Sequence, residues 1–469
     1  MADLFLKEKV QTIVFAKSRV LVEVIYSHLK QKFADVRAYR GGYLPKERRE
    51  IEKGLRSGEI HGVVSTNALE LGVDIGQLQA CILTGYPGSI ASSWQQAGRA
   101  GRRKEESVVI LVANSNPLDQ FMMNHPEYFF ERSPESARIN PDNLIILVDH
   151  LKCAAFELPF QRGETFGGVD VADILEFLAE ERILHENGGK WYWMNDAFPA
   201  HGISLRSASQ ENVVIIDRSD IANVKVIGEM DRFSAMTLLH EEAIYLHQGR
   251  QYQVEKLDWE EKKAYVREVN VEYFTDANLA VRLQVLEEDE KKVFASAVLG
   301  FGDVMINAKA TIFKKIKLST FENIGSGPIH LPEEELHTNA MWLSFSNDVK
   351  EAFSSEETLE YALSGLAHIF QHIAPVFVMC ETNDLHVVYQ IKAIHNEQPT
   401  IFFYDRYPGG IGLSKEVFDN FATIFREAEK AIYRCPCEDG CPSCIGTAAG
   451  KRKVIHLLHY LKKGRTACQ

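Results

Sequence analysis

Two stretches decide the fold of the first hundred residues: Val63–Gly76, V-V-S-T-N-A-L-E-L-G-V-D-I-G, and Gln95–Arg103, Q-Q-A-G-R-A-G-R-R. Arg99 and Arg102 are three residues apart, so on one turn of a helix both guanidinium groups can reach the same anion. A guanidinium is always charged, and its forked donors match phosphate oxygens. The small residues around the two arginines let a bulky polyanion approach closely. The second stretch therefore predicts a surface for phosphate groups, from which an arginine can stabilise the charge that develops in phosphoryl transfer.

Residues 1–115 alternate strand-like apolar runs with helical stretches. The runs cover residues 12–15, 62–65, 80–84 and 107–112. This alternation is typical of a parallel α/β sheet with crossover helices. Ligands of such sheets bind at strand ends and in the loops that follow, which is where the two stretches fall. We predict one parallel-sheet domain over residues 1–115.

Four motifs of this domain, in their order, resemble the second, RecA-like motor domain of superfamily-two helicases. Besides the two stretches above they are Gln11–Arg19, Q-T-I-V-F-A-K-S-R, and Arg40–Glu50, R-G-G-Y-L-P-K-E-R-R-E. The resemblance implies a nucleic-acid track along Ser18, Arg19, Arg40, Gly42, Ser65 and Thr66. It implies a nucleotide-binding set of Gly72, Asp74, Gln95, Arg99 and Arg102, with Gln95, Arg99 and Arg102 as the catalytic residues.

The sequence has no P-loop of the form G-x-x-x-x-G-K-[ST] and no D-E-x-H or D-E-A-D box. Such elements hold the phosphates and the magnesium ion of ATP. The nearest glycine cluster, Gly325–Pro328, lacks the lysine. We therefore expect the C-terminal half of a helicase, which binds ATP and Mg²⁺ only when joined to a missing N-terminal motor domain and is inactive alone.

Composition fits a multidomain protein with substantial cores. The 469 residues are 45% hydrophobic and carry a formal charge of −13, and length alone suggests about three domains. No run approaches the roughly 18 uncharged apolar residues of a membrane span, and the N-terminus lacks the plan of a signal peptide. We expect a cytoplasmic protein without a membrane partner. The negative charge excludes a protein that coats nucleic acid by bulk electrostatics, so binding must use local basic tracks.

Residues 116–200 predict a winged helix. Helical apolar spacing over residues 141–156 and 171–181 is followed by two short apolar runs around Asn187-Gly188-Gly189, a hairpin signal. Trp191 and Trp193 alternate and so face one side of the hairpin. The pair can stack on a base, but a tryptophan pair in a small domain is more often its core, and we favour the core.

Residues 201–318 show short alternating runs and predict a β-rich, barrel-like subdomain. Residues 319–469 predict a helical domain. In it, Ser354 and Glu357 form a capping box before an apolar-periodic helix that Pro375 ends. That helix carries His368 and His372 in an H-I-F-Q-H run, which lacks the glutamate of a zinc-protease motif, so we expect packed or surface histidines.

Four cysteines near the C-terminus predict a metal site. Cys435, Cys437, Cys441 and Cys444 give C-x-C-x₃-C-x₂-C, with prolines and a glycine that bend the backbone between them. Four thiolates this close suit a tetrahedral zinc ion. An iron–sulfur cluster takes the same ligands. Disulfides are the third alternative, but they need an oxidising compartment, and the close Cys435/Cys437 pair is geometrically awkward.

The segment before the cysteines, Tyr404–Ser414, reads Y-D-R-Y-P-G-G-I-G-L-S. Together with the motor motifs and the winged helix, this block and the four cysteines resemble the MrfA-type DNA repair helicases of the RecQ-like group. The resemblance implies the four cysteines as zinc ligands, 3′→5′ translocation on single-stranded or forked DNA, and repair of damaged DNA. Gly409–Gly412 before a helix capped by Ser414 suits an anion site, although a tight turn that docks the helix is the commoner reason for such glycines.

Two other functions stay open from the sequence. One is a non-catalytic module that binds DNA or a protein partner and contains a structural zinc. The other is an RNA helicase, since the same motor motifs serve both nucleic acids. The retained arginines of the second stretch favour the motor over the binding module.

Overall fold

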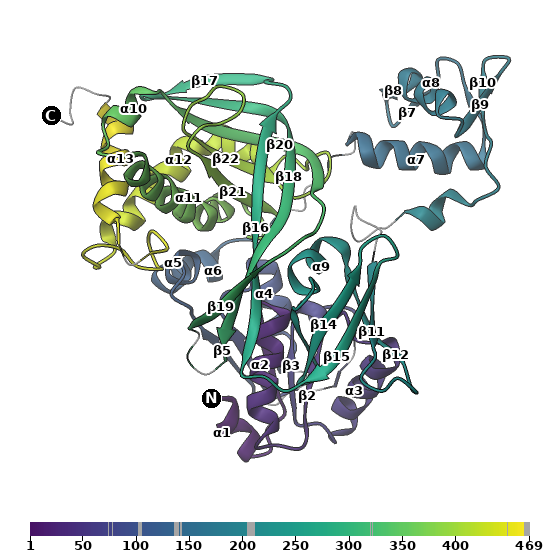
Figure 1. Cartoon of the computed structure of the whole chain (residues 1–469), viewed down its shortest axis with the longest axis vertical. Coiled ribbons are helices and arrows are strands. Elements are labelled where there is room, and N and C mark those ends of the chain that lie inside the picture. The colour runs from purple at the N-terminus through teal and green to yellow at the C-terminus, as the bar shows by residue number, and fades with distance from the viewer. Residues whose placement is uncertain are drawn as a thin grey trace.

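The computed structural model describes residues 1–469 apart from 74, 77, 102–105, 136–139, 141–142, 204–211, 319, 321, 448 and 464–469. Figure 1 shows a body in which N-terminal, central and C-terminal units adjoin, with a smaller lobe that stands out from it. The first unit is a five-stranded parallel sheet in the order β2-β3-β1-β4-β5. The strands are β1 Thr12–Ala16, β2 Val36–Tyr39, β3 Gly62–Ser65, β4 Ala80–Thr84 and β5 Val108–Val112.

This sheet confirms the predicted RecA-like parallel architecture and adds one strand. Strand β2 is not apparent from the sequence, because V-R-A-Y has a polar Arg37 inside a run of only four residues. The helices α1 Ala2–Lys7, α2 Arg19–Lys30, α3 Pro45–Ser57 and α4 Ile90–Ala97 accompany the strands. Two short helices, α5 Pro117–Asn124 and α6 Pro126–Glu131, then connect this unit to the rest of the body.

The lobe in Figure 1 is the predicted winged helix. It consists of α7 Leu144–Glu157, α8 Ala172–Glu180, β6 Phe160–Gln161, β9 Leu184–Asn187 and β10 Lys190–Trp193, with a small β7–β8 ladder at residues 165–170. The strands form a sheet in the order β6-β10-β9. Trp191 is 4% exposed within the core of this lobe, and Trp193 packs against the same core. The expectation that the tryptophans form the core is confirmed.

The β-rich subdomain forms a second five-stranded sheet. Its order is β12-β11-β15-β14-β13, and all neighbouring pairs are antiparallel except β11 with β15. The strands are β11 Asn212–Asp217, β12 Lys225–Asp231, β13 Ile244–His247, β14 Arg250–Asp258 and β15 Lys263–Val269. Helix α9, Arg232–Leu238, contributes Ala235 to the core of this sheet.

A seven-stranded sheet follows, which the sequence analysis does not anticipate. It is built from β16 Tyr273–Val285, β17 Glu290–Phe294, β18 Ala297–Lys317, β19 Asn323–Pro328, β20 Glu334–Phe345, β21 Leu385–Gln390 and β22 Thr400–Asp405. The 21-residue β18 pairs with β16, β17, β19 and β20. Its C-terminal half packs against α9 through Phe313, while Leu299 near its start lies in the core of the C-terminal domain. Strands on both sides of residue 318 therefore share one sheet.

Three long helices cover this sheet, as predicted for residues 319–469, and the strands β19–β22 lie in the same segment. They are α11 Glu356–Val378, α12 Leu413–Arg434 and α13 Lys451–Lys463, preceded by the short α10 Asp348–Glu351. The capping box uses Ser355 and Thr358, one residue beyond the predicted pair, and the helix continues through Pro375 to Val378. By length and composition α11 is apolar enough to cross a membrane, but two thirds of that window is buried inside the protein. It is the central helix of the largest core.

Candidate metal centre and motor surface

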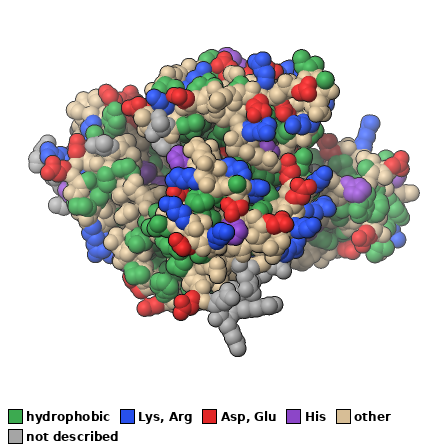
Figure 2. All heavy atoms as spheres, turned by 90° about the horizontal axis from the view of Figure 1, so that it is seen from below, with side chains coloured by type: hydrophobic (Ala, Val, Ile, Leu, Met, Phe, Trp, Pro, Cys, Tyr) green, Lys and Arg blue, Asp and Glu red, His purple; other side chains and the backbone are tan. Residues whose placement is uncertain are grey.

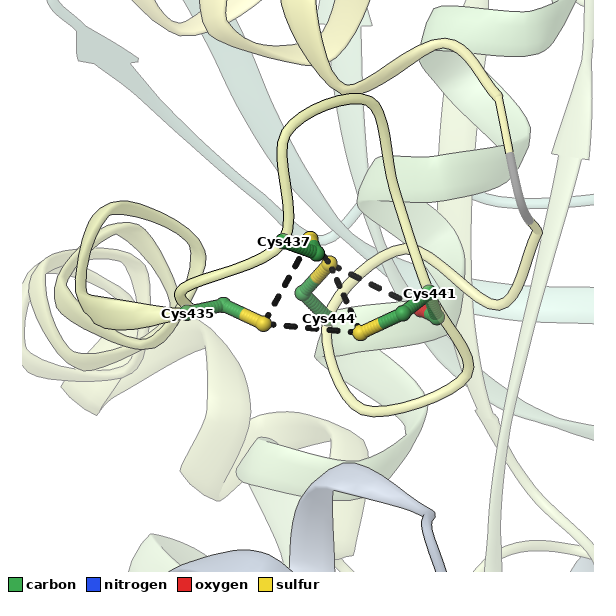
Figure 3. Close-up of side chains that lie close together, drawn as sticks. All are labelled: Cys435, Cys437, Cys441 and Cys444. Carbon is green, nitrogen blue, oxygen red and sulfur yellow. Dashed lines mark hydrogen bonds between the residues drawn. The ribbon is translucent and has the colours of Figure 1, made fainter.

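The four cysteines converge after α12, as Figure 3 shows. Their Sγ atoms are 3.5 Å apart for Cys435–Cys437, 3.4 Å for Cys435–Cys441, 3.5 Å for Cys437–Cys444 and 3.7 Å for Cys441–Cys444. All four sulfur atoms lie within 4.8 Å of one another, and none is in a disulfide. A zinc ion with sulfur ligands at about 2.3 Å sets tetrahedral edges of about 3.8 Å. The spacing therefore fits one tetrahedral metal ion, whereas a multi-iron cluster would hold its cysteines farther apart.

The chain also supplies a cation and a backbone frame for the thiolates. Lys451 at the start of α13 is buried and donates from Nζ to the Cys435 carbonyl at 2.7 Å and the Cys437 carbonyl at 2.8 Å. Its Nζ lies 3.6 Å from the Cys437 sulfur. A buried cation beside four thiolates offsets the excess negative charge that remains after a divalent ion binds. Burial raises the pKa of the Cys441 thiol, but hydrogen bonds led by that with Cys435 outweigh it and bring the pKa to about 7.

The centre is held onto the C-terminal core from several sides. Cys444 and Ile445 are buried in the core that α11, α12 and α13 share. His368 on α11 lies with Nε2 3.1 Å from the Pro442 carbonyl, and His372 lies with Nδ1 2.8 Å from the His368 carbonyl. These two histidines are thus packing residues, as expected, and do not ligate the metal centre.

The glycine block before α12 is a turn closed by a carboxylate. Asp405, at the end of β22, is 0% exposed and accepts hydrogen bonds from the backbone N–H of Ile411 at 2.7 Å, Leu413 at 3.1 Å and Ser414 at 2.7 Å. The N–H groups of Leu413 and Ser414 belong to the first turn of α12, which Gly412 caps in a left-handed conformation, and Ile411 lies just before the cap. Because a carboxylate of the chain already fills this position, the anion-site interpretation of the glycines is wrong and the docking turn is right.

The same turn anchors the winged helix. Asn143 caps α7 through its Oδ1, and its Nδ2 donates to the Pro408 carbonyl at 2.8 Å and the Gly410 carbonyl at 3.0 Å. A Cβ on Gly409 would lie 2.6 Å from the Asn143 amide. Gly409 also has φ +72°, which disfavours a side chain. The glycine run therefore joins the metal-binding domain to the winged helix.

Helix α4 carries the arginine stretch at its C-terminal end. Gln95 is exposed on this helix, whereas Gln96 is buried and donates to Glu70 Oε2 at 2.9 Å. Arg99 is also buried, and its guanidinium donates to the carbonyl of Glu70 and, at 2.6 Å, to that of Val73. Arg99 thus clamps the loop of the Val63–Gly76 stretch to the end of α4. The exposed Gly72 lies in that loop with φ +74°.

The predicted roles of Gln95, Arg99 and Gly72 toward a nucleotide stay predictions. Arg102 and Asp74 lie outside the described residues.

Two acidic residues that are not apparent from the sequence support α4. Glu70 also accepts from Ser92 Oγ at 2.7 Å, and Glu135 accepts from the backbone N–H of Ile90 and Ala91 at the helix start. Isolated glutamates carry no sequence signal for such contacts.

Four of the predicted nucleic-acid residues lie at the C-terminal edge of the parallel sheet. Ser18 is exposed and caps α2, and Thr66 caps the short η1 at Asn67–Leu69. Strands β1 and β3 are adjacent, so these two caps follow neighbouring strand ends. Ser65 is buried and donates to the Thr66 carbonyl at 2.8 Å. Arg19 pairs with Asp231 at 3.4 Å.

Arg40 is a correction, because its side chain is 1% exposed. It donates to Glu23 Oε1 at 3.0 Å, to the Tyr245 hydroxyl at 3.0 Å and to the Leu246 carbonyl at 2.6 Å. Tyr43 and the backbone N–H of Gly249 also donate to Glu23. This network joins the motor-like sheet to the β-rich subdomain, so the side chain of Arg40 does not face nucleic acid.

Gly42 belongs to the same interface and is likewise buried. A Cβ on Gly42 would lie 3.0 Å from the Glu229 carbonyl, and one on Gly228 would lie 2.7 Å from the Gly42 carbonyl. The glycine turn after Arg40 therefore exists for close approach of two backbones. Sequence reasoning could not find this role, since the partners are about 190 residues away along the chain.

Three protein families match separate parts of the chain. The helicase conserved C-terminal domain matches residues 1–104, the winged helix domain of the ATP-dependent helicase HRQ1 matches residues 139–208, and the MrfA Zn-binding domain matches residues 366–445. The last range ends at the fourth cysteine and its neighbour. The zinc assignment for the cysteine centre thus has support from both geometry and family.

Longer relatives match nearly the whole chain. The chain is 65% identical over 468 residues to the uncharacterized ATP-dependent helicase YprA of Bacillus subtilis, covering 98% of this chain and 62% of that protein. It is 29% identical to the ATP-dependent helicase HRQ1 of Saccharomyces cerevisiae, covering 96% of this chain and 44% of that protein. The chain therefore spans less than two thirds of the length of these relatives.

Solved structures agree with these matches. A crystal structure of the DUF1998 helicase MrfA bound to DNA is similar with a TM-score of 0.73 at 65% identity, covering 98% of this chain and 62% of that one. A second MrfA structure, bound to DNA and AMPPNP, has a TM-score of 0.69 at 64% identity, covering 98% of this chain and 61% of that one. The three family matches occur together in this one chain. The chain is MrfA-like along almost its whole length and carries the conserved C-terminal domain of superfamily-two helicases.

Proposed function

We propose that this chain is the C-terminal half of an ATP-dependent DNA helicase that translocates 3′→5′ and acts in DNA repair. The observation that supports it most is the arginine stretch on α4, clamped to the Val63–Gly76 loop through Arg99, in a chain that is 65% identical to MrfA. MrfA has been crystallised with DNA and with AMPPNP, a nucleotide analogue. The chain has no phosphate-binding P-loop of its own.

The proposed nucleotide surface lies at the end of α4. Arg99 fixes the loop by donating to two carbonyl groups, and Gln95 is exposed on the same helix. We assign Gln95, Arg99 and, from the sequence motif, Arg102 to a nucleotide held by another motor domain. An arginine supplied from a neighbouring domain stabilises the charge of phosphoryl transfer and contributes roughly 10³–10⁵ in rate in known systems. Because the phosphates and Mg²⁺ are held elsewhere, the chain alone should not hydrolyse ATP.

The proposed DNA track follows the strand ends at Ser18 and Thr66. The side-chain oxygens of Ser18 and Thr66 accept from the backbone N–H of Leu21 and Ala68, so their hydroxyl hydrogens stay available to donate to phosphate oxygens. Contacts of this kind position a strand without reading its sequence. Since Arg40 is buried, the proposed track uses these hydroxyl donors together with Arg19, which lies at the same edge of the sheet.

The test joins this chain to the part of the Bacillus subtilis relative that precedes the matched region, because 65% identity makes the domain contact transferable. The chimaera should show ATPase activity that single-stranded DNA stimulates, and the chain alone should show none. The variant Arg102→Ala should reduce ATPase by at least about 10³-fold and leave DNA binding, measured by fluorescence anisotropy, within about twofold. The exposed Arg56→Ala on α3 is the matched control. Full turnover of Arg102→Ala, or ATPase activity of the chain alone, would contradict the proposal.

A further inference from the structure

The winged helix carries the wrong charge for a DNA reader. Its residues 143–203 contain ten Asp and Glu against four Lys and Arg, a formal charge of −6. Proteins that bind the phosphate backbone do so with Lys and Arg, and each neutralised phosphate contributes to the affinity. A lobe of this charge repels the polyanion. It stands apart from the body in Figure 1, so its surface is open.

The charge is concentrated on the helix that would enter a DNA groove. In winged-helix and helix-turn-helix folds, the helix before the hairpin takes the place of the recognition helix. Here that helix is α8, A-D-I-L-E-F-L-A-E, which has no Lys or Arg. Its exposed stripe at helical spacing consists of Asp173, Glu176, Phe177 and Glu180, while Leu175 and Leu178 point into the core.

Phe177 lies among these carboxylates and is 54% exposed. An exposed aromatic ring within a charged rim is typical of a protein interface, where such rings serve as anchors. Figure 2 shows hydrophobic and acidic side chains next to one another on this lobe, at the right of the view. More apolar side chains of the lobe are exposed, among them Phe156 and Phe198, whose rings are 5.2 Å apart.

A cavity of about 340 Å³ lies between α8 and the hairpin. Its walls include Glu176, Glu180 and Glu186, one cation at Arg162, and the buried Trp191. The cavity thus combines carboxylates that suit a lysine or arginine side chain with an indole that suits its alkyl part.

From this arrangement we infer that the winged helix is a protein-docking module whose α8 face binds a basic, amphipathic segment of a partner protein. A Lys or Arg of the partner enters the cavity among Glu176, Glu180 and Glu186, and an apolar side chain packs on Phe177. DNA engagement belongs to other parts of the helicase. The inference goes beyond the proposed helicase function and does not depend on it.

The test uses the whole 469-residue chain and a fluorescein-labelled 16-residue peptide of repeated Leu-Lys-Lys-Leu, read by fluorescence anisotropy. Glu176→Gln/Glu180→Gln should weaken peptide binding at least tenfold, and Phe177→Ala at least fivefold. The matched control Glu157→Gln/Asp196→Asn changes the net charge equally but lies outside the cavity walls, and it should change binding less than twofold. A peptide with Glu in place of Lys should not bind.

A second arm measures fluorescein-labelled single-stranded and forked DNA. The α8 variants should leave DNA affinity within twofold, and excess DNA should not displace the peptide. Equal losses in the α8 variants and the control variant would show binding by bulk charge and overturn the inference. Competition between DNA and peptide, or loss of DNA binding in Glu176→Gln/Glu180→Gln, would overturn it as well. Failure of the helicase proposal shows instead in the ATPase of the chimaera, which these variants do not touch.

Discussion

Replacing Arg40 by methionine should loosen the junction between the motor-like sheet and the β-rich subdomain. Arg40 makes three hydrogen bonds of 2.6–3.0 Å to Glu23, Tyr245 and Leu246, and both Arg40 and Glu23 are 1% exposed. In Arg40→Met, Glu23 keeps the donors Tyr43 and Gly249 but loses its counter-ion. Removing one partner of a buried ion pair costs about 3–5 kcal/mol, so we expect a loss of that size.

Hydrogen–deuterium exchange suits this test, because a multidomain chain does not unfold in one step. Peptides from β1, β3, β13 and β14 should exchange faster by a factor equivalent to about 3–5 kcal/mol, while peptides from α7 and α8 should not change. The double variant Glu23→Gln/Arg40→Met no longer has the unpaired buried charge but keeps a hydrogen-bond acceptor. It should therefore recover about 2 kcal/mol or more of the stability that Arg40→Met loses. Arg19→Met, at an ion pair whose two side chains are 34% and 39% exposed, is the control and should cost at most about 1 kcal/mol.

Two results would refute this reasoning. One is a loss in Arg40→Met that does not exceed the loss in Arg19→Met. The other is a specific loss of DNA affinity in Arg40→Met with unchanged hydrogen exchange, which would return Arg40 to the nucleic-acid track.

Removing zinc with a chelator should speed hydrogen exchange at residues 435–445 and in α13, while the motor-like sheet stays protected. Metal analysis should find one zinc per chain. Unchanged protection of residues 435–445 after metal removal would contradict the structural role of the zinc. Asp405→Asn should lower the local stability at the start of α12 by about 1–3 kcal/mol, because an amide nitrogen then faces N–H donors, and hydrogen exchange of α12 equal to that in the exposed Asp419→Asn would count against it. Burial, with the positive charge of Arg40 nearby, lowers the pKa of His247 to about 3. Between about pH 6.5 and 3 the unfolded chain therefore binds a proton that the folded chain does not. The free energy of unfolding should fall by about 1.4 kcal/mol for each pH unit of acidification. His247→Phe should remove that share of the slope in the hydrogen-exchange protection of β13 and β14, measured at pH 7, 5.5 and 4.5 and corrected for the intrinsic exchange rate. An identical slope would show that His247 does not titrate as described.

Local signals in the sequence were enough to predict the metal centre and the docking turn. The four cysteines lie within ten residues, so their convergence needs only a bent backbone, which the prolines and Gly440 provide. The winged helix was predictable for the same reason, since Asn187-Gly188-Gly189 marks the hairpin and the tryptophans mark its core.

Pairing across long sequence distances was not predictable. The seven-stranded sheet joins β18 to β20 and β22, and a strand's alternating pattern does not say which strand lies beside it. Arg40 shows the same limit for a site residue: the motif in which it lies suggests a surface, but Tyr245 and Leu246 bury it from 205 and 206 residues away. The Pro375 prediction failed because tertiary burial of α11 outweighs the lost hydrogen bond.

The long strand β18 connects the β-rich subdomain to the C-terminal zinc-binding domain. At about 3.3 Å per residue, its 21 residues extend roughly 70 Å. Its C-terminal half packs against α9 of the β-rich subdomain, and its N-terminal part lies in the core that contains α11. Arg40 links the β-rich subdomain to the motor-like sheet by hydrogen bonds. If β18 moved as one rigid piece, a tilt of about 5° at its C-terminal end would displace its N-terminal end, beneath the zinc domain, by roughly 6 Å.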